Sequence, residues 1–174
     1  EEHLSTYDGL PTKQKLELLT ITKNLPKELH TEIQKNKAKE TMNVLFDTIK
    51  PRMEFTKIFM ALSNAGYRLA LASNAVRSTV ETALDCLELR KYFDVIYSNE
   101  DVKRPKPNFE MYFKIMMDLN SKPNETLILE DSHIGRQAVL DAGCHLLPII
   151  DTYDVKLEKI EAKLNELNKQ IIVR

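Results

Sequence analysis

The strongest constraint on the fold is the regular alternation of short apolar runs with helical patterns between residues 51 and 150. Residues 52–65 have helical character and end at Gly66, a common helix terminator. Apolar runs of strand length follow at residues 67–72 (YRLALA), 93–97 (FDVIY), 126–129 (TLIL) and 144–150 (CHLLPII). Helical patterns separate them, at residues 78–89, 108–119 and 134–142. Because strands joined by helices pair in parallel, the sequence predicts an α/β fold with a doubly wound parallel sheet, covered by helices on both faces.

The segment before residue 50 lacks this alternation. Its apolar residues recur at helical spacing among Lys, Glu and Gln, as in the series Leu16, Leu19, Leu29, Ile33 and Leu45. The sequence therefore predicts an all-helical segment ahead of the α/β part.

Composition excludes several functional classes. The 174 residues include 25 Lys and Arg against 26 Asp and Glu, so no basic excess is available for binding nucleic acid. The apolar runs are far shorter than the roughly 20 residues that span a bilayer, which argues against membrane insertion. The first 30 residues contain no apolar core typical of a secretory signal, so we expect a cytoplasmic protein.

Polar residues follow the apolar runs at the places where an α/β sheet binds ligands, the carboxyl ends of its strands. Ser73 and Asn74 follow the first run, and a hydroxyl beside a helix N-terminus suits an anion. Glu130 and Asp131 follow the third run, and paired carboxylates suit a hard cation such as Mg²⁺. Lys106 lies in a loop stiffened by prolines after the second run.

Each of these features alone has a simpler interpretation. Ser73 is also a common N-cap residue, the carboxylates could cap the next helix, and a loop lysine is usually solvated. Together, however, three strand ends supply a hydroxyl, a cation and a carboxylate pair. That combination predicts a site for a phosphate group and its metal ion.

These residues resemble three motifs of the haloacid dehalogenase (HAD) superfamily. Ser73 and Asn74 after an apolar strand resemble motif II, residues 106–112 (KPNFEMY) resemble motif III, and residues 129–135 (LEDSHIG) resemble motif IV. Residues 142–143 (AG) complete the last pattern. One departure is Phe109, where the family usually has proline.

The resemblance implies a division of the chain into two parts. It is strong from about residue 51 to residue 150, and implies a HAD-like α/β core over residues 51–174. It is weaker before residue 50, where residues 1–50 resemble part of the helical cap of the phosphoglucomutase-like and phosphatase-like branch. Within that cap, Lys13 and Lys15 could meet an anionic substrate.

The resemblance also implies a role for each site residue. Ser73 would hydrogen-bond the transferring phosphoryl group with help from the Asn74 backbone, and Lys106 would neutralise it and orient the nucleophile. Asp131 would bind Mg²⁺, and Glu130 would share that task. Arg104 could take the place of Lys106 through the sequence RPKP, but the downstream match favours Lys106.

The family's first motif has no counterpart in the sequence. That motif is an apolar strand ending in D-x-D-G, whose first Asp attacks phosphorus and whose second acts as general acid and base. The chain has four glycines, and the one Asp-Gly pair, at Asp8, has Thr6 where the nucleophile belongs. We therefore reject Asp8 as a catalytic acid.

The missing motif would leave a gap in the sheet. In the family its strand lies between those that lead to Ser73 and Glu130, so without it two apolar strands would face each other with open edges. We expect this chain to be a truncated form, inactive alone, of a protein that carries the motif upstream.

The sequence leaves three hypotheses for the function. The first is a Mg²⁺-dependent phosphatase or phosphomutase acting on a small phosphorylated metabolite, such as a sugar phosphate. The second is an inactive HAD-like protein that binds a phosphorylated ligand or a protein partner. The third is cleavage of a carbon–halogen bond, which has no use for Mg²⁺, so the pair of Glu130 and Asp131 argues against it. We expect a monomer, with a dimer through the amphipathic residues 155–171 as the alternative.

Overall fold

The computed structural model describes residues 10–172, so Asp8 and the other residues before Leu10 lie outside the described part. The helices in this part are α2 (Thr12–Lys23), α3 (His30–Thr48), α4 (Met53–Asn64), α5 (Arg77–Cys86), α6 (Glu110–Asp118), α7 (His133–Asp141) and α8 (Leu157–Ile172). The strands are β1 (Ala70–Ala72), β2 (Val95–Tyr97), β3 (Leu127–Glu130) and β4 (His145–Pro148). Every strand and helix predicted between residues 52 and 150 is present, and β1, β2 and β4 are shorter than the apolar runs that predicted them.

The strands pair in parallel, as predicted, but in two separate sheets. β1 pairs with β2, with Leu71 opposite Ile96, and β3 pairs with β4, with Leu129 opposite Leu147. Among the described residues no hydrogen bonds join the two pairs into one sheet. The split lies where the sequence analysis predicted a gap, between the strands that lead to Ser73 and Glu130.

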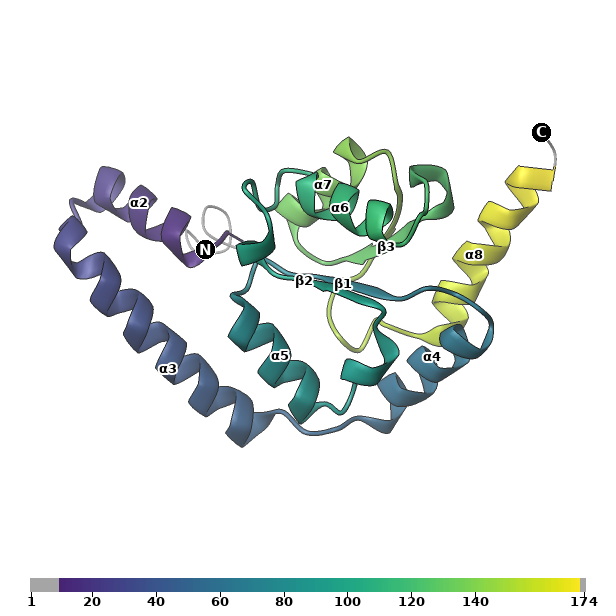
Figure 1. Ribbon diagram of the computed structural model, residues 1–174, viewed down its shortest axis with the longest axis horizontal. Helices are drawn as coiled ribbons and strands as arrows, with labels where there is room; N and C mark the ends of the chain where they lie inside the picture. The colour runs from purple at the N-terminus through teal and green to yellow at the C-terminus, as the bar shows by residue number, and fades with distance from the viewer. Residues whose placement is uncertain (1–9, 173–174) are drawn as a thin grey trace.

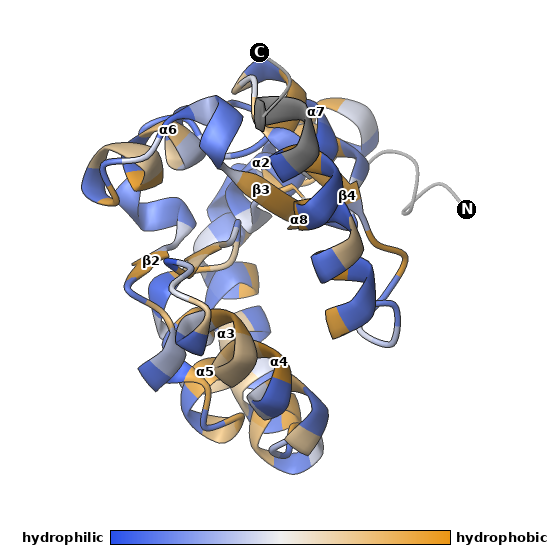
Figure 2. Ribbon diagram, turned by 90° about the vertical axis from the view of Figure 1, so that its right-hand side faces the viewer, coloured by the Kyte–Doolittle hydropathy of each residue, from blue (hydrophilic) through white to orange (hydrophobic). Residues whose placement is uncertain are grey.

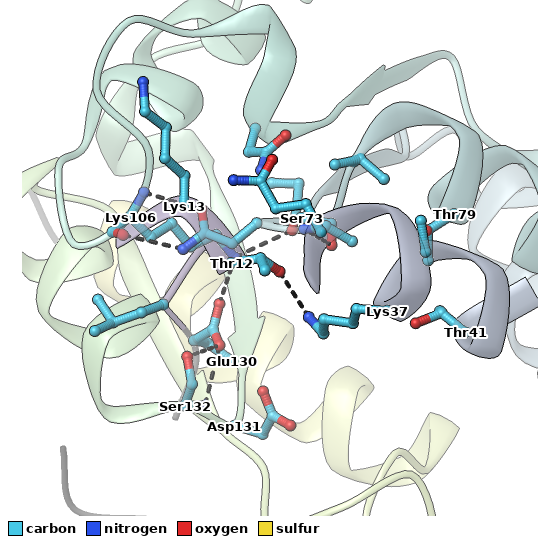
Figure 3. Close-up of a pocket in the computed structure, with 18 of the residues that line it drawn as sticks. Thr12, Lys13, Lys37, Thr41, Ser73, Thr79, Lys106, Glu130, Asp131 and Ser132 are labelled. Carbon is cyan, nitrogen blue, oxygen red and sulfur yellow. Dashed lines mark hydrogen bonds and ion pairs between the residues drawn. The ribbon is translucent and has the colours of Figure 1, made fainter. Parts of the chain in front are cut away.

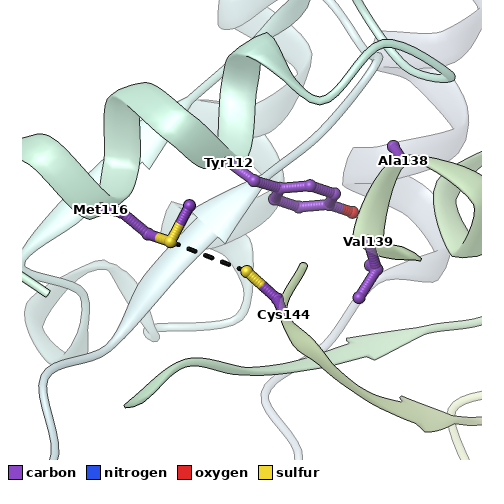
Figure 4. Packing of buried hydrophobic residues seen from close by; sticks show 5 residues of the cluster. All are labelled: Tyr112, Met116, Ala138, Val139 and Cys144. Atoms are coloured by element: carbon purple, nitrogen blue, oxygen red, sulfur yellow. Dashed lines mark hydrogen bonds between the residues drawn. The ribbon is translucent and has the colours of Figure 1, made fainter. Parts of the chain in front are cut away.

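Helices cover both faces of the strands. In Figure 1, α6 and α7 lie on one side of β1 and β2, and α4 and α5 lie on the other. On the first side, Ala138 and Val139 of α7 pack with Tyr112 and Met116 of α6 and with Cys144, as Figure 4 shows. This arrangement confirms the α/β class with helices on both faces.

The opposite layer forms two further apolar clusters. Ile58 and Leu62 of α4 pack with Leu147 of β4 and Ile160 of α8. Val80 and Leu84 of α5 form the third cluster with Leu89. In Figure 2, β3 is hydrophobic, whereas the helices carry hydrophilic residues as well. The strands therefore lie between the helical layers. Residue 160 thus belongs to the core, and α8 packs on its own chain as the sequence predicted.

A cavity of about 550 Å³ separates the two sheets. Its lining includes residues 69–72, around β1, and residues 126–130, around β3. Leucines line the cavity from both strands: Leu69 and Leu71 around β1, and Leu127 and Leu129 in β3. We call this cavity the inter-sheet slot. It separates β1 from β3, the two strands whose open edges were predicted to face each other.

The helices α2 and α3 form an arm beside the strands, on the left of Figure 1. Asn24, the residue after α2, has a left-handed backbone (φ 56°), which lets the N–H of Leu25 donate to the carbonyl of Leu19 over 3.3 Å. The helix α3 contacts both α2 and α5. The all-helical prediction for residues 11–49 is confirmed. None of the described helices combines the length and apolar character needed to cross a membrane.

Buried and exposed methionines on one helix provide a test of this packing. Met111 is fully buried in α6, and Met117 of the same helix is 66% exposed. We expect Met111→Ala to lower the free energy of unfolding by about 2–5 kcal/mol, because it removes packed atoms and leaves a cavity. The matched change Met117→Ala should cost less than about 0.5 kcal/mol. Denaturant unfolding measures both, and equal losses would contradict the described packing of α6.

Candidate functional site

A pocket of about 610 Å³ opens at the carboxyl ends of β1 and β3, and Figure 3 shows it from close by. The five residues singled out in the sequence all line it: Ser73, Asn74, Lys106, Glu130 and Asp131. Their elements are far apart in the chain, and the parallel strands bring them together. The structure therefore places the predicted site residues in one cavity.

Lys106 and Glu130 form a buried ion pair in this pocket. The Lys106 Nζ donates to Glu130 Oε2 over 2.7 Å, and the two side chains are only 9% and 7% exposed. The same Nζ donates to the carbonyl of Ala72 at the end of β1, over 3.1 Å. Lys106 thus connects the ends of β1 and β3 from a loop that belongs to neither strand.

The Glu130 carboxylate has three further donors. The hydroxyl of Tyr112 donates to Oε2 over 3.0 Å, and Ser132 donates to Oε1 from its N–H (3.0 Å) and its hydroxyl (2.7 Å). Burial alone would raise the pKa of Glu130, but the charge of Lys106 and the hydrogen bonds from Lys106 and Ser132 outweigh it and lower the pKa to about 2. Glu130 is therefore an anion at neutral pH.

Asn74 positions the loop that carries Lys106. Its Nδ2 donates to the Lys106 carbonyl over 3.0 Å, and its Oδ1 accepts the Lys106 N–H over 3.1 Å. Nearby, the Ser73 hydroxyl oxygen accepts the N–H of Ala75 over 3.1 Å. A hydroxyl that accepts in this way still has its own proton to donate. Asn74 thus acts through Lys106, and Ser73 keeps a donor for a ligand.

Arg104, the alternative to Lys106, lies outside the pocket lining. Its side chain is 70% exposed and pairs with Glu110 over 3.4 Å. The Glu110 carboxylate also accepts the N–H groups of Lys103 (2.9 Å) and Arg104 (3.1 Å), which fixes the start of the loop. The geometry therefore favours Lys106 over Arg104 as the cation of the site.

Asp131 is the more accessible of the two adjacent carboxylates. Burial raises the pKa of Asp131, and so do a hydrogen bond with Glu130 and the negative charge of Glu130. A cation beside Asp131 would offset this repulsion, and carboxylate oxygens are ligands that Mg²⁺ prefers. Among the described residues, however, no cluster of three or more His, Cys, Asp or Glu side chains could hold a metal ion. This part of the chain therefore offers only part of a metal-ligand set.

The arm of α2 and α3 supplies another wall of the pocket. Most of the residues in this wall were not predicted from the sequence. Lys13 lines the pocket as anticipated, and Lys15 does not. Thr12, Lys37 and Thr41 line it as well. The helical pattern of residues 30–48 contains several lysines, and nothing in their spacing indicates which one faces the site.

Tyr112 and Gly135 belong to the segments that resemble motifs III and IV, but the sequence analysis assigned neither of them a role in the site. The Tyr112 side chain is 3% exposed and occupies the apolar face of α6, so its pattern alone indicates a core residue. At Gly135, an added Cβ would overlap the carboxyl group of Glu130. The glycine of this motif therefore provides the space in which the Glu130 carboxylate lies.

The space at Gly135 can be tested by adding one methyl group. We expect Gly135→Ala to lower the free energy of unfolding by about 1–3 kcal/mol, because Cβ and the Glu130 carboxyl cannot share the space. In a Glu130→Ala background the same change should cost little, or stabilise by up to about 1 kcal/mol through helix propensity. Chemical denaturation of the unaltered protein, the two single variants and the double variant measures this coupling. Equal costs in the two backgrounds would contradict it.

The low pKa of Glu130 predicts a dependence of stability on acid. A carboxyl whose pKa is lower in the folded than in the unfolded protein stabilises the fold above its unfolded pKa, near 4.3, and less as the pH falls toward its folded pKa. We expect Glu130→Gln to cost about 3–5 kcal/mol at pH 7, because it leaves the Lys106 charge buried without its partner.

This cost should shrink as the pH falls from 5 to 3, and urea unfolding across that range measures it. Glu166→Gln is the matched control, because Glu166 is 53% exposed and pairs with Lys163 at the surface. Its cost should stay below about 1 kcal/mol at every pH. A cost for Glu130→Gln that does not change with pH would contradict the assigned pKa direction.

Comparisons with known proteins agree with this geometry. The sequence profile of the haloacid dehalogenase-like hydrolase family matches residues 1–149. A phosphorylated carbohydrates phosphatase from Thermotoga maritima is 30% identical over 137 residues, which cover 78% of this chain and 60% of that protein. The pyrophosphatase PpaX of Bacillus mycoides is 27% identical over 128 residues, or 74% of this chain and 53% of that protein. The chain thus spans little more than half the length of these curated relatives.

Solved structures of similar proteins have the same fold. A β-phosphoglucomutase from Clostridium difficile superimposes with a TM-score of 0.76 at 20% identity, over 95% of this chain and 80% of that one. CbbY from Rhodobacter sphaeroides, solved in complex with phosphate, superimposes with a TM-score of 0.64 at 26% identity, over 74% of this chain and 58% of that one. Since the family profile covers most of its length, the chain belongs to the haloacid dehalogenase-like hydrolases.

Proposed function

We propose that this chain supplies the phosphate-binding half of a phosphoryl-transfer site for a small phosphorylated metabolite such as a sugar phosphate. The activity would be that of a phosphatase or phosphomutase, and the attacking carboxylate would come from a further strand seated in the inter-sheet slot. One observation carries the proposal. The slot and the site pocket have four lining residues in common, which are Ala72, Lys106, Leu129 and Glu130.

This shared lining matters because of the direction of the strands. β1 and β3 both carry site residues at their carboxyl ends. A strand seated between them and parallel to them would end at the same place, beside Lys106. A carboxylate following such a strand would reach the pocket that holds Ser73 and Asp131. The placement of the chemistry thus follows from strand direction.

Lys106 and Ser73 would bind the phosphoryl oxygens. An ammonium group has three N–H donors, and Ala72 and Glu130 accept two of those of Lys106. The third is available to a phosphoryl oxygen, as is the hydroxyl proton of Ser73. Asn74 would keep Lys106 in place through its two hydrogen bonds to the loop backbone. Fixed positive charge and fixed donors are what phosphoryl transfer chiefly requires from a protein.

Asp131 would be a ligand of Mg²⁺, whose charge would help to neutralise the phosphoryl oxygens. Glu130 would share that task less directly, because each of its oxygens already accepts hydrogen bonds from Lys106, Tyr112 or Ser132. The further oxygen ligands would have to come from the strand in the slot and from water.

We also propose the division into a partial helical cap over residues 1–50 and a core over residues 51–174. The pocket supports it, because Thr12 of α2 and Lys37 of α3 face core residues across one cavity. The curated relatives support the substrate class, since one is described as a phosphatase of phosphorylated carbohydrates and another as a pyrophosphatase.

An inactive binding protein is the second candidate. The observation in its favour is that the described residues contain no cluster of three metal-binding side chains. Under this alternative, phosphate would bind at Lys106 and Ser73 without being transferred, even with the slot filled.

Supplying the strand separates the two candidates. We expect a longer form of the protein, with an apolar strand ending in Asp-x-Asp-Gly ahead of residue 1, to release phosphate from sugar phosphates in the presence of Mg²⁺ and to lose this activity with chelator. In that form Asp131→Asn should lower kcat/KM by roughly 10²-fold or more, because it removes a metal ligand.

Asp141→Asn is the matched control. Asp141 lies at the end of α7 and accepts a hydrogen bond from Gln137 at the surface, so activity should change less than about twofold. Steady-state phosphate release measures all three proteins. Absence of turnover in the longer form, with phosphate binding intact, would favour the inactive binding protein.

A further inference from the structure

Asn99 lines the site pocket and carries an oxygen atom that has no hydrogen-bond partner. The residue is half-buried and lies two positions beyond the end of β2. Among the buried side-chain nitrogen and oxygen atoms of the described part of the chain, Asn99 Oδ1 is the one without a hydrogen bond. A buried acceptor without a partner costs free energy, because it gives up its hydrogen bonds to water. A ligand in the pocket would supply the missing donor.

The backbone of Asn99 is held in place although its side-chain oxygen is unbonded. Its N–H donates to the carbonyl of Ala75, in the loop after β1, over 3.1 Å. The preceding residue, Ser98, is fully buried. The Ser98 hydroxyl donates to Asp101 Oδ2 over 2.6 Å and accepts the N–H of Glu100 over 3.2 Å. A ligand contact on this fixed backbone needs little further ordering.

The pocket lining contributed by the elements around Asn99 is uncharged. It includes Ala75 from the loop after β1 and Thr79 from α5. The charged residues next to these in the sequence, Arg77 and Glu100, do not line the pocket. They face each other instead, since Glu100 accepts the N–H of Arg77 over 2.6 Å. This end of the pocket therefore suits a neutral polar group.

The group that best complements a side-chain amide is a hydroxyl. An amide has one acceptor oxygen and two N–H donors, and a hydroxyl both donates and accepts. A phosphate oxygen or an ammonium group would use only one of these two functions. Within the described residues no hydrogen bond restrains the Asn99 amide, so it can turn about its Cβ–Cγ bond to present either function.

Asn99 lies on the side of the phosphate site that is away from the inter-sheet slot. The strand β2 pairs with β1, and residues 95–97 of β2 do not line the slot. In Figure 3 Thr79, which follows β1, and Lys106 lie on opposite sides of Ser73. A ligand with its phosphoryl group at Ser73 and Lys106 can therefore extend its remaining atoms toward Asn99, in a cavity large enough for a whole metabolite.

We propose that the Asn99 amide binds a hydroxyl group of the substrate, next to the phosphoryl group held by Lys106 and Ser73. This inference rests on the proposed function and narrows its substrate class to phosphate esters of polyols, sugars included. Esters with an apolar remainder of the same size bind more weakly, because they leave the Asn99 oxygen without a donor.

Two pairs of phosphate esters test the proposal by calorimetry on the chain as it is. Glucose 6-phosphate and cyclohexylmethyl phosphate share a six-membered ring, and glycerol 3-phosphate and propyl phosphate share a three-carbon chain. The first member of each pair carries hydroxyls and the second does not. We expect the hydroxylated member of at least one pair to bind roughly fivefold or more tightly than its analogue, and Asn99→Ala to reduce this preference to less than about twofold.

The matched control is Asn64→Ala, which removes the same atoms from an exposed position at the end of α4, outside both cavities. It should leave the preference unchanged within about twofold. Without ligand, the urea midpoint of Asn99→Ala should not fall below that of the unaltered chain, because the side chain gives up no hydrogen bond.

Three results would overturn the proposal. The first is no preference for hydroxylated esters in the unaltered chain. The second is a preference that persists in Asn99→Ala, as expected if an internal water molecule alone satisfies Oδ1. The third is a lower urea midpoint for Asn99→Ala together with an equal loss of affinity for both members of each pair, which would give Asn99 a structural role only.

Inorganic phosphate separates this inference from the one on which it rests. Its binding should be lost in Lys106→Met and kept in Asn99→Ala. If phosphate failed to bind the unaltered chain, or bound Lys106→Met equally well, the proposed phosphate site would fail and the inference on Asn99 with it. If phosphate behaved as expected and neither pair of esters responded to Asn99→Ala, only the inference on Asn99 would be wrong.

Discussion

The buried ion pair between Lys106 and Glu130 is the interaction on which the rest of the site depends. Two charges this far from water are stable only when their remaining hydrogen-bonding groups are satisfied. Ala72, Tyr112 and Ser132 meet that requirement, and they belong to β1, to α6 and to the start of α7. The hydrogen bonds to this ion pair therefore connect the ends of both sheets with the helices on one face.

The same packing explains how two small sheets keep their spacing. The cluster around Tyr112 and Val139 includes contacts with Ala72 of β1 as well as with Ile128 of β3. On the other face, the cluster around Leu62 contacts Leu69 and Leu127, on either side of the inter-sheet slot. Side chains of the helical layers thus bridge the slot from both sides, where no strand-to-strand hydrogen bond does.

The features predicted correctly from the sequence are those that depend on hydrophobic periodicity and on strand direction. The alternation after residue 50 predicted parallel strands and covering helices, and the polar residues after each run predicted which side chains would meet. It could not predict the partners that lie on apolar helical faces, as Tyr112 does, because a buried hydroxyl leaves the pattern unchanged. Nor could it select Lys37 from the lysines of α3, because that choice depends on how α2 and α3 pack beside the strands.

The place of Gly135 has a consequence for how this sequence can change over time. The Glu130 carboxylate fills the space where a side chain at 135 would lie, and it is kept there by the charge of Lys106. Replacing any one of the three residues alone leaves either a clash or a buried charge without a partner. These positions are therefore expected to vary together among related chains, so that a change at one is accompanied by compensating changes at the others.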